Sequence, residues 1–337
     1  MIEDHKYMDE ELLDRYKKTV KTKWQKRWIL LRMLFGELFF FLGNLSKAVK
    51  SIAYYFFTHK KNSLFKDISY HSKPRNQMDI YSPVGAVDKS EKKPVLIFVH
   101  GGTWAYGFKL QYILLGKLLS QVGIVTVILN YTLYPNGFIQ DMVEDVDKAV
   151  EYCYKNISKF GGDPSRIYLM GHSAGGHIIT MLTTGKFIKG EHSHMIKGVL
   201  ACSGVYDIAD HFIWETGRGV EHLSAMNKAM KGPSHFHVNS PTRLLTKHHQ
   251  SNPIPKTPVL LPPLYLLHGD QDKTVPLHEA KKLYKIYRDQ YGGKHQHKLI
   301  VYPNVGHIDF MFQLMENPPT SNPILKDILL IVNDKLN

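Results

Sequence analysis

The residues Gly171-His172-Ser173-Ala174-Gly175-Gly176 have the types and spacing needed to present a reactive serine. They follow a short, mostly apolar run at residues 166–170. An apolar run with helical character comes after them at 177–182. A strand, a sharp Gly-x-Ser-x-Gly turn and a helix in that order form a nucleophile elbow. The glycines let strand and helix approach closely, and the helix N-terminus favours developing negative charge. The pattern predicts that Ser173 is a nucleophile; a chance Gly/Ser turn is the alternative.

A serine hydroxyl is a weak nucleophile, so it needs a base, and the base needs an orienting acid. After a nucleophile elbow these partners follow in the chain order acid, then histidine. The loop 268–276 carries Asp270 and Asp272 directly after a predicted strand, and His307 comes just past the last predicted strand. Both positions lie at the sheet edge where open α/β sheets bind ligands.

The elements that must position these side chains alternate along the chain. Short apolar runs between amphipathic stretches predict a mostly parallel α/β sheet with helices on both faces. Helices are expected at 111–121, 138–159, 277–288 and 323–336, the second with Met142, Val146, Val150 and Tyr154 on one apolar face. Strands are expected at 68–71, 77–81, 94–99, 124–130, 166–170, 196–202, 263–268 and 298–302.

Residues 205–258 do not continue the alternation of strands and helices. They are interpreted as an inserted cap over the active-site face, with helical stretches such as 220–230 among loops. The insertion is rich in histidine, but only His235-x-His237 approaches a ligand spacing, so no metal site is predicted. Cys153 and Cys202 lack metal-ligand or redox spacing and are expected to be core or helix-face thiols. Without a disulfide framework, cysteine usage favours a reducing compartment.

Residues 1–61 are expected to form a separate helical segment in front of a catalytic domain at 62–337. The net charge of +13 concentrates there, since 15–32 holds eight Lys or Arg and no acid. The apolar stretch 33–46 follows, and a basic flank beside such a stretch is typical of an anionic membrane surface contacted through residues 15–61. Arg32 and Glu37 cut it below the roughly 20 residues of a spanning helix. A helix that caps the catalytic domain is the alternative; nucleic-acid binding is not expected, because no recognition module accompanies the basic run.

The chain resembles an α/β-hydrolase of the serine esterase/lipase superfamily, from about Ile68 to the C-terminus. Within that superfamily it is most similar to the prenylcysteine methylesterase-like and kynurenine-formamidase-like branches. The basic, apolar N-terminus and the segments 203–208 and 218–219 resemble the first of these, the prenylcysteine methylesterase-like branch. The motifs that carry the superfamily resemblance are residues 100–104 (HGGTW), 130–135 (NYTLYP), 160–166 (FGGDPSR), 171–176 (GHSAGG), 268–276 (HGDQDKTVP) and 306–307 (GH).

The resemblance implies Ser173 as nucleophile, His307 as general base and acid, and Asp272 as orienting carboxylate. The later acid is chosen because it aligns in the family pattern His-Gly-x-x-Asp-x-x-Val-Pro, which makes Asp270 a structural neighbour. The remaining histidines near these motifs are expected to be structural, because none lies in the Gly-His loop after the last strand; they are His172, His177 and His268.

An oxyanion hole is expected from backbone N–H groups that already point at the developing charge. The resemblance implies the N–H of Ala174, after the nucleophile, and those of Gly102 and Thr103, in the loop after the 94–99 strand. Related lipases have a glycine where this chain has Thr103, and a β-branched residue tolerates unusual φ poorly, which leaves its dihedrals open. Trp104 is expected either to line the substrate pocket or to pack in the core.

The expected activity is hydrolysis of small-molecule carboxylic esters through an acyl-enzyme, with no cofactor. The alternatives are an amidohydrolase of the kynurenine formamidase type, a lysophospholipase or lipase, and, remotely, a non-catalytic receptor on the same fold. An intracellular location is expected, either cytoplasmic or peripherally attached to an internal membrane such as the endoplasmic reticulum.

Overall fold

The computed structural model describes residues 8–29, 31, 49–58, 62–87, 89–251, 261–291, 297–316 and 321–336. The apolar stretch 33–46, which carries much of the prediction of a membrane interface, lies outside these residues. No helix of the described part is long and apolar enough to cross a membrane.

A single sheet of eight strands runs through the described residues between 64 and 302, in the order β1-β2-β4-β3-β5-β6-β7-β8. The first two strands pair antiparallel, as do β2 and β4, and every other pair is parallel. The mostly parallel sheet predicted from the sequence is confirmed. The strands are β1 Leu64–Ser69, β2 Gln77–Tyr81, β3 Lys93–Val99, β4 Val125–Leu129, β5 Gly162–His172, β6 Gly198–Cys202, β7 Leu264–Gly269 and β8 Lys298–Tyr302.

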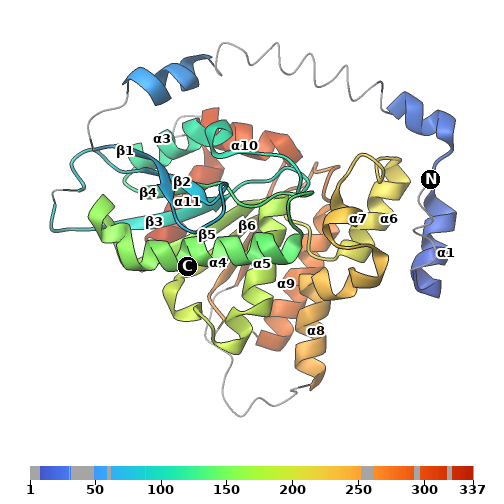
Figure 1. The fold of residues 1–337 in the computed structure, drawn as a ribbon. Helices are drawn as coiled ribbons and strands as arrows, with labels where there is room; N and C mark the ends of the chain where they lie inside the picture. The colour runs from blue at the N-terminus through green and yellow to red at the C-terminus, as the bar shows by residue number, and fades with distance from the viewer. Residues whose placement is uncertain are drawn as a thin grey trace.

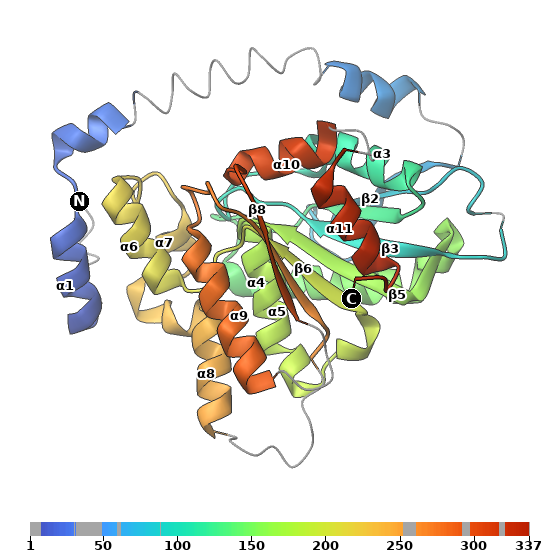
Figure 2. The ribbon, with the colours of Figure 1, turned by 180° about the vertical axis from the view of Figure 1, so that it is seen from behind.

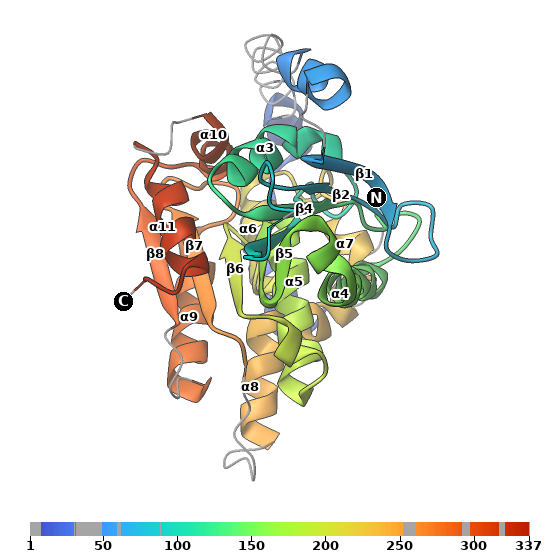
Figure 3. The same ribbon diagram turned by 90° about the vertical axis from the view of Figure 1, so that its left-hand side faces the viewer.

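Helices cover both faces of the sheet (Figures 1 and 2). One face packs against α4 Ile139–Asn156, α5 Ala174–Gly185 and α9 Leu277–Tyr291. The other packs against α3 Ile113–Gln121, α10 His307–Glu316 and α11 Pro323–Val332. Figure 3 shows β7 and β8 at one edge and β1 at the other. The central strands are buried on both faces, which is why they read as continuous apolar runs rather than alternating ones.

Two helix predictions need correction. On α4 the buried face carries Met142, Val146 and Val150 as expected, but Cys153 continues it, and Tyr154 is 37% exposed. At 3.6 residues per turn, position 154 lies about 120° around the helix from Met142, whereas position 153 lies only about 20° from it, so Cys153 faces the core. Helix α10 was not expected, since the loop histidine itself begins that helix. The two cysteines are free and buried, as predicted.

The described part of the predicted insertion, residues 205–251, contains three α-helices, α6 Ile208–Arg218, α7 Met226–Ala229 and α8 Pro241–Ser251. The expected helix over 220–230 is wrong except at its end, because Gly219 ends α6 in a left-handed conformation and turns follow. Helix α8 packs against α5 and α9, which binds the insertion to the nucleophile side of the sheet. Short 3₁₀ segments lie at Lys109–Tyr112, Ile157–Phe160, Phe187–Lys189, Ser193–Met195, Pro233–His235 and His237–Asn239.

The N-terminal helix α1 Glu10–Thr19 packs against α6 of the insertion. Its Tyr16 stacks on Phe212 at 5.9 Å between ring centroids, and Arg15 donates a 2.8 Å hydrogen bond to Asp210. A helical turn at 23–29 follows, from which Lys26 pairs with the buried carboxylate of Glu221. The N-terminal segment is described again at residues 49–58. There, residues 54–58 form a π-helical turn, and Tyr55 in this turn is buried.

Candidate active site

Ser173 lies at the tight turn between β5 and α5, with φ of 55° and ψ of −122°. A non-glycine residue with positive φ is strained, and such strain is typical of a nucleophile elbow. The turn is possible because Gly171 and Gly175 lack side chains: a Cβ on Gly171 would lie 2.4 Å from the Gly175 oxygen, and one on Gly175 would lie 2.1 Å from the Val99 oxygen. The Ser173 N–H donates to the Cys202 oxygen at 2.9 Å, which fixes the turn to β6.

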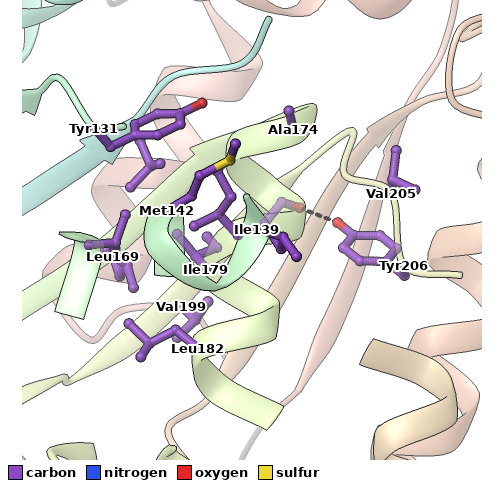
Figure 4. Close-up of a cluster of buried hydrophobic side chains, with 14 of the residues drawn as sticks. Tyr131, Ile139, Met142, Leu169, Ala174, Ile179, Leu182, Val199, Val205 and Tyr206 are labelled. Carbon is purple, nitrogen blue, oxygen red and sulfur yellow. Dashed lines mark hydrogen bonds between the residues drawn. The ribbon is translucent and has the colours of Figure 1, made fainter. Parts of the chain in front are cut away.

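The core below this turn is filled by side chains from the sheet, α4 and α5 (Figure 4). Leu169, Val199 and Ala174 belong to the same buried cluster as Met142 and Ile179. Figure 4 also shows Tyr206, whose hydroxyl donates to the Ala201 oxygen at 3.2 Å. The elbow is therefore held on a rigid base, which is what a strained turn needs to persist.

Asp272 and His307 meet at the ends of β7 and β8. The His307 Nδ1 lies 2.8 Å from Asp272 Oδ2, and since a carboxylate only accepts, Nδ1 carries the proton and Nε2 is left free to accept one. Asp272 Oδ1 accepts from the N–H groups of Thr274 and Val275 at 2.9 and 2.8 Å. Burial alone raises the pKa of Asp272, but these hydrogen bonds, chiefly that from His307, hold the pKa below its ordinary value.

Asp270, the other carboxylate of this loop, points elsewhere. Its Oδ1 accepts from the N–H of Asn304 at 2.7 Å and so ties the acid loop to the loop that precedes His307. His268 lies on β7 with its Nε2 2.9 Å from the Val275 oxygen and 3.5 Å from Asp272 Oδ2. Both residues support the geometry around Asp272, as expected for structural neighbours.

His172 brings the histidine loop to the nucleophile turn. Its ring lies 4.8 Å from that of His307 between centroids, and its Nε2 donates to the His307 carbonyl at 3.1 Å. Because Ser173 follows directly in the chain, this contact places the His307 loop beside the elbow. Burial lowers the pKa of His172 to about 3, so its ring is neutral at neutral pH and adds no charge beside His307.

The loop after β3 reaches the same point. A Cβ on Gly101 would lie 3.0 Å from the Cβ of Ser173, so the loop backbone packs closely against Ser173. Three consecutive residues of the loop have positive φ, namely Gly102 at 120°, Thr103 at 48° and Trp104 at 60°. Thr103 therefore adopts a left-handed backbone conformation, although a β-branched residue tolerates it poorly. Its side chain is exposed, which limits crowding by neighbouring atoms.

Trp104 is 2% exposed, and its indole N–H donates to His177 Nδ1 at 3.1 Å. Since Nδ1 accepts, the proton of His177 lies on Nε2, which donates to the Asn239 oxygen in the insertion at 2.8 Å. Burial lowers the pKa of His177 to about 4, which keeps this tautomer neutral. Of the two roles expected for Trp104, these contacts favour packing, with the pocket role left as a prediction.

Arg75, in the turn between β1 and β2, is not among the residues singled out from the sequence. Its Nε donates to the Tyr131 oxygen at 2.9 Å and a terminal nitrogen donates to the Gly107 oxygen at 2.8 Å. The guanidinium therefore joins the end of the 101–107 loop to the segment after β4. The only sequence signal was an arginine beside a proline in a predicted turn, which is too common to single out.

No group of three or more metal-ligating side chains is found within the described ranges. His237 instead accepts from Arg243 at Nδ1, at 2.9 Å, and donates from Nε2 to Asp9 of the N-terminal segment, at 3.1 Å. His235 Nδ1 lies 3.0 Å from the Ser234 hydroxyl. The two histidines with the nearest approach to a ligand spacing thus have other partners.

The chain shares sequence similarity with known proteins. The sequence profile of the BD-FAE family matches residues 78–287, more than half of the chain. Isoprenylcysteine α-carbonyl methylesterase ICME of Arabidopsis thaliana is 35% identical over 272 residues, which are 78% of this chain and 60% of that protein. Kynurenine formamidase of Danio rerio is 29% identical over 177 residues, 52% of this chain and 58% of that protein. The chain thus spans about three fifths of the length of these curated relatives.

Solved structures show the same fold. Esterase B from Lactobacillus rhamnosis matches with a TM-score of 0.60 at 16% identity, over 92% of this chain and 97% of that one. A bifunctional GH43-CE protein of Bacteroides eggerthii matches with a TM-score of 0.63 at 20% identity, over 83% of this chain and 39% of that one. At such identities the likeness shows the fold alone, and it confirms the predicted α/β-hydrolase fold.

Proposed function

The chain belongs to the BD-FAE family, and from that premise we propose that it is a serine hydrolase that cleaves carboxylic esters with Ser173, His307 and Asp272. The observation that carries the proposal is the 2.8 Å hydrogen bond from His307 to the buried Asp272, beside a serine held in a strained elbow. Relatives named methylesterase and esterase support the same chemistry.

In the proposed reaction the Ser173 oxygen attacks the ester carbonyl carbon while His307 Nε2 takes its proton. Asp272 stabilises the imidazolium that forms. The carbonyl oxygen becomes an oxyanion, which accepts from the N–H of Ala174 and from those of Gly102 and Thr103. The alcohol leaves with the proton from His307, and water then attacks the acyl-enzyme by the reverse route, releasing the acid.

The substrate we would assay first is the methyl ester of a prenylated cysteine, because relatives with this substrate in their names match most of the chain. An N-formyl amide is the second candidate, since kynurenine formamidase is also a relative. Both reactions use the same catalytic groups, so the ratio of kcat/KM for the two substrates decides between them.

The test of the proposed activity uses a fluorophosphonate probe, which reacts only with an activated serine. Wild-type protein should be labelled and should hydrolyse nitrophenyl esters, and Ser173→Ala should lose labelling and at least about 10³-fold in kcat. Ser203→Ala is the control, because Ser203 is another serine with positive φ but its side chain is buried, and this variant should keep both. Equal labelling of the Ser173→Ala variant would refute the assignment.

We propose in addition that the N-terminal segment attaches the protein peripherally to an anionic membrane such as that of the endoplasmic reticulum. The inner side of the 23–29 turn carries Lys26, paired with Glu221, whereas Trp24 and Trp28 are 67% and 64% exposed one helical turn apart. Exposed basic residues, Lys23 and Arg27, flank these indoles. Tryptophans among basic side chains suit the boundary between headgroups and acyl chains.

Residues 49–58 carry a second group of exposed apolar side chains, which includes Ile52, Phe56 and the 84% exposed Phe57. Flotation with vesicles of mixed neutral and anionic lipid tests the attachment. Wild-type protein should float at low salt, and a Trp24→Ala, Trp28→Ala variant should float at least about 10-fold less while keeping ester turnover. Equal flotation of the double variant, or none by wild type, would overturn it.

A further inference from the structure

We propose that Arg75 is a positioning residue for the proposed oxyanion hole. By donating hydrogen bonds to two backbone carbonyls, it fixes the loop 101–107 so that the N–H groups of Gly102 and Thr103 remain oriented towards the developing negative charge. The proposal rests on the proposed esterase function, and it adds to it a residue more than 90 positions from the nucleophile along the chain.

The contacts of Arg75 join two segments that enclose the loop. Its Nε donates to the Tyr131 oxygen at 2.9 Å, just past β4, and a terminal nitrogen donates to the Gly107 oxygen at 2.8 Å, at the end of the loop. The Tyr131 hydroxyl in turn donates to the His100 oxygen at 2.8 Å, at the start of the loop. Both ends of the loop are therefore tied, directly or through Tyr131, to one guanidinium.

The loop needs such a tie because its backbone is strained. Gly102, Thr103 and Trp104 have positive φ in succession, and Gly107 follows with φ of 112°. Left-handed non-glycine residues cost free energy and persist only where surrounding contacts hold them. Within the loop, the N–H groups of Ala105 and Tyr106 donate to the Gly102 oxygen at 3.1 and 2.9 Å, which closes the turn. The middle of the loop is held at Trp104, whose oxygen accepts from the Tyr134 N–H at 2.9 Å, whereas Arg75 holds its ends.

The C-terminal end of the loop, at Gly107, is also tightly packed against neighbouring atoms. A Cβ on Gly107 would lie 2.4 Å from His100 Nδ1, so the chain passes directly over the His100 ring. His100 is fully buried and its Nδ1 lies 2.8 Å from the Gly101 oxygen. A shift of Gly107 would therefore move Gly101, whose Cα faces the Ser173 Cβ, and the effect would reach the nucleophile.

Only arginine can make both contacts at once, because its planar guanidinium presents several N–H donors in a fixed fork. Lysine at the same position keeps the charge but offers a single nitrogen on a flexible chain. The Arg75→Lys variant therefore separates alignment by the fork from a simple effect of positive charge. Lys73, two residues earlier, is a matched control, since its ammonium pairs with two carboxylates of α4, Asp145 at 3.0 Å and Asp141 at 3.5 Å.

The experiment compares kcat, KM and melting temperature for wild type, Arg75→Met, Arg75→Lys and Lys73→Met on a nitrophenyl ester. Loss of one oxyanion donor in a hydrolase costs on the order of 10²–10³-fold in kcat. We expect about a 10²-fold loss for Arg75→Met, about 10-fold for Arg75→Lys, KM within about 2-fold, and kcat within about 2-fold for Lys73→Met. Affinity for a trifluoromethyl ketone, whose serine adduct carries an oxyanion, should fall in step with kcat.

A kcat for Arg75→Met within about 2-fold of wild type would overturn the proposal, as would an equal loss in Lys73→Met at matched melting temperature. If Arg75→Met does not fold, Arg75→Lys decides by the same criterion. Failure of the underlying esterase function looks different, because wild type itself would then show neither ester turnover nor probe labelling.

Discussion

His307 donates a 2.8 Å hydrogen bond from Nδ1 to Oδ2 of Asp272, 35 residues earlier in the chain. The Asp272 side chain is completely buried and that of His307 is 11% exposed, so the carboxylate is shielded from solvent while part of the imidazole is accessible. Asp270, only two residues from Asp272, binds a backbone N–H instead. The following predictions start from this pair.

Replacing the two loop carboxylates by amides should have very different effects. Asp272→Asn presents an N–H₂ or a weaker acceptor to His307, disturbs its tautomer, and should lower kcat on the order of 10³–10⁴-fold. Asp270→Asn keeps an oxygen acceptor for the Asn304 N–H and should stay within about 3-fold. Steady-state kinetics on one nitrophenyl ester measure both variants, and a reversed ranking would move the acid to Asp270.

Trp104→Phe should reduce stability more than activity. The substitution leaves Nδ1 of the buried His177 without its donor, and an unsatisfied buried polar group costs about 1–3 kcal/mol. Urea denaturation measures the loss, with the exposed Trp24→Phe as control, expected within about 0.5 kcal/mol. A change in KM larger than about 5-fold with unchanged stability would instead assign Trp104 to the substrate pocket.

Stability should fall as the pH is lowered from about 6.5 towards 4. Burial lowers the pKa of His100 and His177 to about 4 and that of His172 to about 3. Their folded pKa values lie below the unfolded value of about 6.5. The stabilisation is therefore complete above pH 6.5 and is lost as the pH falls through the folded values, at about 1.4 kcal/mol per pH unit for each histidine.

His211 acts in the opposite direction. Burial alone lowers its pKa, but the Glu279 carboxylate at 2.7 Å raises it above the ordinary value, so its stabilising effect is present at low pH and is lost as the pH rises. Urea denaturation at pH 7, 6, 5 and 4.5 measures the net effect. The slope should be smaller in His177→Gln than in wild type, and a stability that is flat or rises towards pH 4.5 would contradict the assignment of neutral buried histidines.

Lys26→Met should loosen the N-terminal segment from the insertion. Lys26 pairs with Glu221, whose side chain is 1% exposed and whose second oxygen has no hydrogen-bond partner in the described structure. Breaking a buried pair leaves an uncompensated charge, so we expect a loss of up to about 3 kcal/mol. The exposed pair of Lys18 and Asp14 is the control, and Lys18→Met should cost no more than about 0.5 kcal/mol.

The double variant Lys26→Met, Glu221→Gln distinguishes a buried ion pair from a general effect of the lysine. It should recover at least half of the loss, because the uncompensated carboxylate is gone. If the double variant is less stable than Lys26→Met, the two residues do not act as a pair.

Local sequence patterns were enough to predict the central strands and the turn that carries Ser173. A buried strand of a parallel sheet has no polar face, so each central strand could be read as an uninterrupted apolar run, and β3, β4, β6, β7 and β8 lie within two residues of their expected bounds. The Gly-x-Ser-x-Gly turn was readable because its glycines meet a steric need within six residues. The resemblance supplied the choice of Asp272 over Asp270 as the acid, which spacing alone left open.

Only the tertiary structure decided the contacts that join distant segments. The sequence gives no reason why Arg75 should grip Gly107 and Tyr131, or why Trp104 should donate to His177, since each pair depends on where the chain returns. The helix expected at 220–230 within the insertion was misplaced, because helices α6 and α8 are stabilised by packing against α1, α5 and α9 rather than by their own pattern. Local sequence specifies strands and tight turns through sterics and burial, whereas hydrogen bonds across long separations are set by the folded sheet.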